Sequence, residues 1–261
     1  MRRQLDYYWR LIGTALSFSC FGLGGLLISL TLFPIIHLVS PRRDLANRRC
    51  QYVVHKSFQV FIWLMRSLGV LTYEIEGAER LAGKGGHVIV ANHPSLIDVV
   101  FIVSMLPEAL CVVKKAAWSN PFLVGVMLAT GYIQNVDPVQ LIETCAANVA
   151  RGRNLVIFPE GTRTVPGRPI KLKRGAASII VRCRQPIIPI TITSKPTTLT
   201  KAEKWYEIPQ TRVHFRITVG HSVDLQPKIV DDEPLSLSNR RINQVLKKML
   251  LEGIERHERA G

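Results

Sequence analysis

The feature that most constrains this chain is a long uncharged run near its N-terminus. Residues 11–41 contain no Asp, Glu, Lys or Arg. A helix over residues 11–33 would extend about 35 Å, which exceeds the roughly 30 Å hydrocarbon core of a bilayer. The run is too long for a signal-peptide core, and no small-residue cleavage site follows it. The sequence therefore predicts a membrane-embedded helix over residues 11–38, which either crosses the bilayer or re-enters one leaflet.

The charge of the chain points to an anionic partner. Lys and Arg number 34 against 19 Asp and Glu, for a net charge of +15. Both nucleic acid and an anionic membrane fit that balance. The uncharged run favours the membrane, and the absence of an aromatic-interleaved basic stripe or a recognition helix argues against nucleic acid. The Arg-rich turn at residues 42–49 is denser in charge than the stretch before the run, which favours the cytoplasmic face of an inner or plasma membrane for the remainder.

The five cysteines predict neither a disulfide framework nor a metal site. They are odd in number and widely spaced, without a C-x-x-C pair. No His-x-x-x-His pair or carboxylate cluster supplies three ligands near the chemistry-bearing residues described below. We expect no metal.

From residue 72 onward, short β-rich runs alternate with helical stretches. This alternation predicts an α/β fold with a mixed sheet flanked by helices. The expected strands lie at residues 72–77, 87–92, 110–115, 154–161, 186–193 and 213–220, and the expected helices at 94–105, 121–129, 138–150 and 174–183.

Four segments follow from this pattern. We expect a membrane anchor at residues 1–50, an amphipathic or interfacial helix at 51–71, a catalytic domain at 72–225 and a C-terminal amphipathic helix at 226–261. The helix at 51–71 either faces the membrane or packs on the catalytic domain. The anchor is single-pass or monotopic, depending on whether its helix crosses the bilayer.

His93 and Asp98 are the first candidates for chemistry. The strand at residues 87–92 runs into a turn that places His93 at the entrance of the next helix and Asp98 about one turn inside it. A carboxylate bonded to one ring nitrogen of a histidine fixes its tautomer and raises the basicity of the other nitrogen. The spacing therefore predicts the base and orienting residue of a catalytic triad whose nucleophile is a substrate hydroxyl.

A second cluster follows the strand that begins at residue 154. Glu160 can accept a hydrogen bond from a hydroxyl, Gly161 lets the backbone approach a ligand, and Arg163 can bind phosphate or carboxylate. Further along lie Arg168, Lys171, Lys173 and Arg174. This basic cluster is either a solvated surface or a cradle for an anionic head group or thioester carrier.

Four motifs, in this order, resemble the 1-acylglycerol-3-phosphate acyltransferase (lysophospholipid acyltransferase) family. They are residues 92–98 (NHPSLID), 158–163 (FPEGTR), 172–175 (LKRG) and 187–190 (IIPI). The resemblance covers about residues 70–220 and implies a glycerolipid acyltransferase-like fold.

The resemblance also implies roles for individual residues. His93 would be the general base on the acceptor hydroxyl and Asp98 its partner. Pro189 would border the site of the acyl chain. The substrate-binding residues would be Asn92, Ser95, Glu160, Gly161, Thr162, Arg163, Lys173 and Pro189.

The expected reaction moves a fatty acyl group from acyl carrier protein or coenzyme A to a lysophospholipid-type acceptor, without a cofactor. One departure concerns the acceptor: Asp137 stands where the family usually has an Arg that helps to hold the acceptor phosphate. Lysophosphatidic acid and a lipid without that phosphate, such as a lyso-aminolipid or glycolipid, therefore both remain candidates. A non-catalytic basic membrane-binding module is the remaining alternative.

Overall fold

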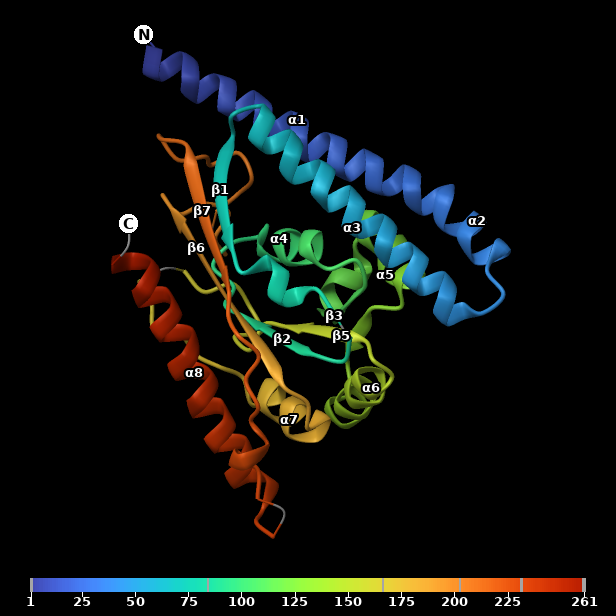
Figure 1. The fold of residues 1–261 in the computed structure, drawn as a ribbon. Helices are drawn as coiled ribbons and strands as arrows, with labels where there is room; N and C mark the ends of the chain where they lie inside the picture. The colour runs from blue at the N-terminus through green and yellow to red at the C-terminus, as the bar shows by residue number, and fades with distance from the viewer. Residues whose placement is uncertain (1, 84, 166, 202, 231, 260–261) are drawn as a thin grey trace.

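A mixed β-sheet forms the centre of the molecule (Figure 1). The computed structural model describes residues 2–83, 85–165, 167–201, 203–230 and 232–259. Seven strands in this part of the chain are ordered β1-β7-β6-β2-β5-β3-β4, and only β6 and β7 pair antiparallel. The strands are β1 (Leu71–Glu76), β2 (Val88–Ala91), β3 (Ala109–Lys114), β4 (Ile133–Asn135), β5 (Asn154–Ile157), β6 (Ile187–Lys195) and β7 (Val213–Val219). The predicted mixed sheet is confirmed.

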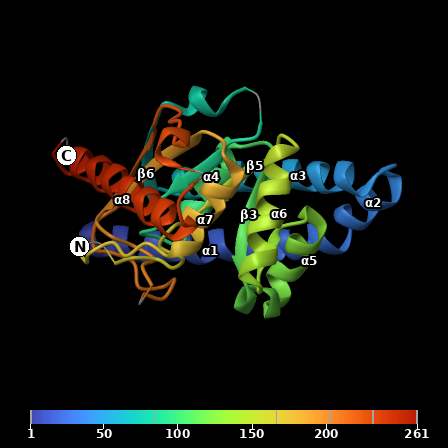
Figure 2. The same ribbon diagram turned by 90° about the horizontal axis from the view of Figure 1, so that it is seen from below.

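Helices cover both faces of this sheet (Figures 1 and 2). One face carries α1 (Arg2–Leu30), α2 (Leu32–Val39), α3 (Arg43–Ser67), α4 (Asp98–Met105) and α5 (Pro121–Thr130). The other face carries α6 (Pro138–Ala150), α7 (Arg174–Cys183) and α8 (Leu235–Arg259). Short 3-10 turns are η1 (Ala78–Leu81), η2 (Lys115–Ser119) and η3 (Gln226–Lys228).

Strand β2 shows why the sheet has two cores. All of its residues are buried, as expected for a central parallel strand covered on both faces. Ile89 and Ala91 pack in the cluster that includes α3 and α4, whereas Val88 and Val90 pack in the cluster with α6, α7 and α8. Successive side chains point to opposite faces, so the residues that follow β2 begin at the edge between these two layers.

The start of α4 differs from the sequence prediction. We expected this helix from Pro94, but it begins at Asp98 after a turn. The Asp98 carboxylate accepts the N–H of Ser95 at 2.6 Å, so a side chain holds the turn in place of helical backbone bonds. Similarly, the strand expected at 154–161 ends at Ile157, where Gly161 N–H turns back to Phe158 O at 2.9 Å. The short strand β4 was not predicted.

The N-terminal helices form a layer of their own. In the described chain, one helical run, Arg2–Val39, is long and apolar enough to cross a membrane, and 6% of its most apolar stretch is buried. Helix α3 returns beside α1 and contacts α4, α5 and β1 (Figure 1). It begins earlier than the predicted helix at 51–71. Helix α8 lies across the sheet from this layer, against α7 and β6.

Candidate active site

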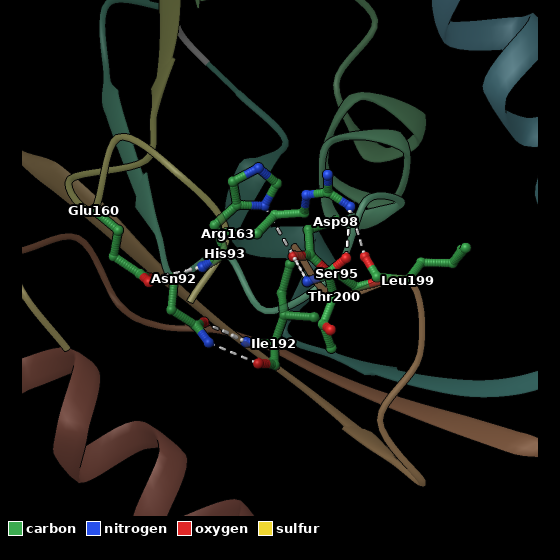
Figure 3. Close-up of polar contacts among 9 residues, drawn as sticks. All are labelled: Asn92, His93, Ser95, Asp98, Glu160, Arg163, Ile192, Leu199 and Thr200. Carbon is green, nitrogen blue, oxygen red and sulfur yellow. Dashed lines mark hydrogen bonds and ion pairs between the residues drawn. The ribbon is translucent and has the colours of Figure 1, made fainter. Parts of the chain in front are cut away.

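The site lies at the carboxyl edge of three adjacent parallel strands, β2, β5 and β3. Ligand sites in α/β sheets favour this edge because the loops that follow neighbouring strands converge there. Asn92 anchors the loop after β2 to the neighbouring strand (Figure 3). Its buried amide donates to Ile192 O and accepts from Ile192 N–H, both at 2.7 Å. Both amide atoms of Asn92 are thus occupied in positioning His93.

His93 and Asp98 are in direct contact, as their spacing predicted. His93 Nδ1 lies 3.0 Å from Asp98 Oδ2, and the His93 ring stacks on Phe158 with centroids 4.3 Å apart. The carboxylate acts as acceptor, so it favours the tautomer with a proton on Nδ1. This arrangement leaves Nε2, on a partly exposed ring, as the basic nitrogen that a substrate can meet.

Burial sets the electrostatics of this pair. Asp98 is completely buried, and loss of hydration raises its pKa to about 6, against the opposing hydrogen bond and charge of His93. Its Oδ1 atom and the neighbouring Ser95 Oγ are buried without a hydrogen-bond partner among the described residues. Unpaired buried polar atoms cost free energy, and they call for an explanation at the site where they occur.

Glu160 lies on the other side of the His93 backbone. It is buried, and its Oε1 accepts the His93 N–H at 2.7 Å. Its Oε2 has no hydrogen-bond partner in the part of the chain that the structure describes. Glu160 and Asn92 line a cavity of about 690 Å³ between β6, β7 and α8, so the Glu160 side chain lies beside space for a ligand.

The loop from Gly161 to Arg163 follows Glu160 directly. Gly161 has φ +64°, a left-handed conformation that glycine adopts without strain, and an added Cβ would lie 3.2 Å from Lys173 Cγ. Arg163 donates through one nitrogen to the carbonyls of Leu199 and Thr200 at 2.8 and 3.0 Å (Figure 3). Thr162 between them is half-buried.

A ring of basic side chains surrounds this loop. The pKa of Lys114, at the end of β3, is lowered by burial first and then by the positive charges of Lys201, Lys173 and Arg163. Each of these three charges therefore repels that of Lys114. Sequence reasoning missed Lys114 and Lys201. Lys114 could have been found because it ends the strand next to β5, whereas nothing local to Lys201 pointed to the site.

Two other predicted positions lie apart from this cluster. Pro189 is not among the described residues that line the cavity, and its carbonyl accepts Gly220 N–H at 2.8 Å. Asp137 caps helix α6, where its carboxylate accepts the N–H of Gln140 at 2.7 Å. The acidic side chain that stands in place of an expected Arg thus has a structural partner. In the described chain, no group of three His, Cys, Asp or Glu residues is arranged to hold a metal ion.

The comparisons with known proteins agree with this architecture. The family model described as "Acyltransferase" matches residues 72–193. A 1-acyl-sn-glycerol-3-phosphate acyltransferase from Cocos nucifera is 28% identical over 148 residues, which cover 53% of this chain and 46% of the relative. The enzyme of the same name from Helicobacter pylori is 32% identical over 115 residues, covering 41% and 48%.

A putative enzyme of this name from Caenorhabditis elegans is 29% identical over 170 residues, covering 62% of this chain and 58% of the relative. The match therefore spans about half the length of these curated relatives. Among solved structures, the 1-acyl-sn-glycerophosphate acyltransferase of Thermotoga maritima shares the fold, with a TM-score of 0.65 at 17% identity. That alignment covers 96% of this chain and 97% of the other.

Proposed function

We propose that this chain is a member of the 1-acyl-sn-glycerol-3-phosphate acyltransferase family and a membrane-bound enzyme that transfers a fatty acyl group from a thioester to a lysophospholipid hydroxyl. The observation that carries the proposal is the contact of His93 Nδ1 with the buried Asp98 carboxylate at 3.0 Å. The domain that we assign to this chemistry is residues 72–225, between the anchor at 1–50 and helix 51–71 on one side and the C-terminal helix 226–261 on the other.

The proposed mechanism is direct transfer. His93 Nε2 takes the proton of the acceptor hydroxyl, while Asp98 stabilises the imidazolium that forms. The acceptor oxygen attacks the thioester carbonyl, a C–O bond forms, and the tetrahedral intermediate collapses with loss of the thiolate. The thiolate takes the proton from His93, so the base is restored without an acyl-enzyme or a cofactor. Acyl carrier protein and coenzyme A can both supply this thioester.

The acceptor that we propose is 1-acylglycerol-3-phosphate. The charges of Arg163, Lys173 and Lys201 all act on Lys114, and such a gathering of positive charge suits a phosphate. The free Oε2 of Glu160 can accept a hydrogen bond from an acceptor hydroxyl. Thr162 lies between Gly161 and Arg163 in the sequence, Ser95 donates its N–H to Asp98, and Asn92 acts through the position of the loop. Because Asp137 is occupied as a helix cap, its charge does not by itself exclude a phosphate acceptor.

The arrangement of the N-terminal helices favours a monotopic anchor over a membrane-crossing one. Near the start of α1, Arg10 donates to Pro209 O at 2.8 Å, in the segment before β7. Near the other end, His37 in α2 lies 3.1 Å from the carbonyl of Ala129 in α5. The helical layer thus contacts the catalytic domain along its length, which suits helices lying in the interface of the cytoplasmic leaflet.

The test is an acyl-transfer assay with detergent-purified protein. Labelled acyl-coenzyme A and acyl-acyl carrier protein are each offered with lysophosphatidic acid, monoacylglycerol and a lyso-aminolipid. We expect lysophosphatidic acid to be acylated, and Arg163→Gln and Lys114→Gln to raise its KM with little effect on monoacylglycerol. The matched control is Arg182→Gln, which removes an exposed Arg on α7. A preference for monoacylglycerol or the lyso-aminolipid would overturn the phosphate assignment, and no transfer from either donor would contradict the enzyme proposal.

A further inference from the structure

The loop between β6 and β7 carries large exposed aromatic side chains. Trp205 is 45% exposed and Tyr206 is 44% exposed. Their rings pack edge to face, with centroids 5.5 Å apart, and Lys204 Nζ lies 5.5 Å from the Tyr206 ring centroid. Trp and Tyr beside Lys are typical of the lipid–water interface, where the ring has an apolar body and a polar edge.

One end of this loop is joined to the proposed active site. Leu199 O accepts from Arg163 at 2.8 Å and from the Leu96 N–H at 3.0 Å. Thr200 O accepts from the same Arg163 nitrogen at 3.0 Å. Lys201 follows directly and contributes its charge to the basic ring around Lys114. The loop therefore helps to set the position of groups that we assign to the acceptor.

The other end of the loop is joined to α1. Arg10 is 1% exposed and donates to Pro209 O at 2.8 Å, Gln210 O at 2.7 Å and Thr211 O at 3.3 Å. Trp205 lies against the same side of the molecule, since it shares a small cavity with Arg10 and Thr14. In Figure 2 this orange segment lies beside the N-terminal half of α1. Tyr8 and Trp9 of α1 are themselves more than half exposed, at 60% and 54%.

Its own acidic side chains brace the loop. Glu203 accepts the N–H of Thr200 at 2.8 Å, and Glu207 accepts the N–H of Lys204 at 2.9 Å. These bonds hold two successive turns, so the aromatic pair at the tip is presented on a formed structure. Nearly half of each side chain is open, so the pair presents a large aromatic surface outside the core.

We propose that residues 196–201 and 203–212 belong to an interfacial docking loop, which seats Trp205 and Tyr206 among lipid head groups beside α1. This proposal rests on the membrane location in the proposed function. Its occupant is a lipid surface, because the aromatic pair and its lysines continue the exposed aromatic face of the membrane-facing helix α1. Docking would place the basic ring at the height of lipid phosphates, so an acceptor could enter the site without leaving the membrane.

The test measures the environment of Trp205 in vesicles of phosphatidylcholine and phosphatidylglycerol. A variant that keeps Trp205 alone carries Trp9→Phe, Trp63→Phe and Trp118→Phe. On reconstitution we expect a blue-shifted emission, loss of quenching by iodide, and stronger quenching by lipids brominated near the head group than by lipids brominated near the chain end. Unshifted emission that iodide still quenches would overturn the proposal. The same result is expected if the aromatic pair binds a protein partner instead of lipid.

The matched control adds Lys248→Trp to a background that also carries Trp205→Phe. Lys248 is exposed on α8, across the sheet from α1, so its tryptophan should remain open to iodide. If the three-Phe background fails to fold, the difference in emission between wild type and Trp205→Phe gives the same readout. Neither measurement involves acyl transfer. An inactive protein in which lipid quenches Trp205 would contradict only the proposed activity. An active protein in which Trp205 stays exposed to water would contradict only the docking loop.

Discussion

The turn after β2 and the N-terminal part of α1 both bury charged side chains, but the hydrogen-bonding capacity of these side chains is used to different extents. In the N-terminal part of α1, every guanidinium nitrogen of Arg10 donates a hydrogen bond, to Asp6 and to three backbone carbonyls. In the turn after β2, Asp98 Oδ1 and Ser95 Oγ have no partner among the described residues, and neither has Glu160 Oε2 in the neighbouring loop after β5.

This difference separates an anchor from a site. A buried charged side chain whose hydrogen bonds are all made holds two segments together. One with unpaired polar atoms is kept at a cost in folding free energy, which a bound substrate can relieve by supplying the missing partner. We therefore expect changes at Arg10 to lower stability and changes in the turn after β2 to lower activity. This interpretation would be contradicted if changes at Arg10 lowered activity and changes in the turn after β2 lowered stability instead.

The largest effect is expected for Asp98→Asn. Loss of the carboxylate removes the group that stabilises the imidazolium, so the transfer rate should fall about 10³-fold. The free energy of unfolding at neutral pH should rise by about 1–3 kcal/mol, because a buried charge is removed. Steady-state transfer and urea unfolding of one preparation measure both. A variant that is both active and less stable would show that Asp98 is a structural ion.

Arg10→Met should have the opposite profile. It leaves three carbonyls and Asp6 without their donor, so the free energy of unfolding should fall by about 3 kcal/mol. Below the melting transition, transfer by the folded fraction in detergent should continue. The matched control is Arg3→Met, an exposed position on the same helix. Equal unfolding midpoints for the two variants would contradict the anchoring role of Arg10.

The pH dependence sharpens the assignment of Asp98. Burial raises the pKa of Asp98 to about 6, and the active form is the carboxylate. Activity should therefore fall as the pH drops through about 6, by up to about tenfold per unit. Stability has the opposite slope: the folded state binds this proton more tightly, so the contribution of Asp98 falls as pH rises from its ordinary pKa to about 6 and is then constant. In Asp98→Asn the acidic limb of the residual activity should move to lower pH, because the negative charge that favours protonation of His93 is removed. A limb at an unchanged pH would assign it to a group outside this pair.

The smallest effect is expected at Asp137. Asp137→Ala removes the cap of α6 and should cost about 1 kcal/mol of stability, whereas Asp137→Asn keeps an acceptor and should cost less. Neither change should alter the preference among acceptors. Thermal unfolding and the acceptor panel measure this. If either substitution changed the preference among acceptors, Asp137 would have to contribute to acceptor binding.

Much of this organisation could be predicted from local pattern. The helices 138–150 and 174–183 match their predicted bounds because apolar spacing and a proline or basic start define them. The contact between His93 and Asp98 was also predictable, since both residues belong to one turn. The family resemblance is confirmed by the comparisons.

Contacts between distant segments could not be predicted in this way. Arg10 belongs to the charged stretch before the uncharged run, yet the three backbone carbonyls that it binds lie about 200 residues away. Lys201 and the carbonyls of Leu199 and Thr200 reach Arg163 only through the return of a long loop. The start of α4 was misplaced because a proline at a first turn normally favours a helix, whereas here the Asp98 side chain holds a preceding turn.

The most direct test of the account is the transfer rate of His93→Ala measured beside its unfolding free energy. The control is His221→Ala, an exposed position outside the site. We predict that His93→Ala lowers transfer to lysophosphatidic acid about 10³-fold or more while the protein stays folded, and that His221→Ala changes neither quantity. A folded His93→Ala variant that transfers acyl groups at the wild-type rate would contradict the central claim.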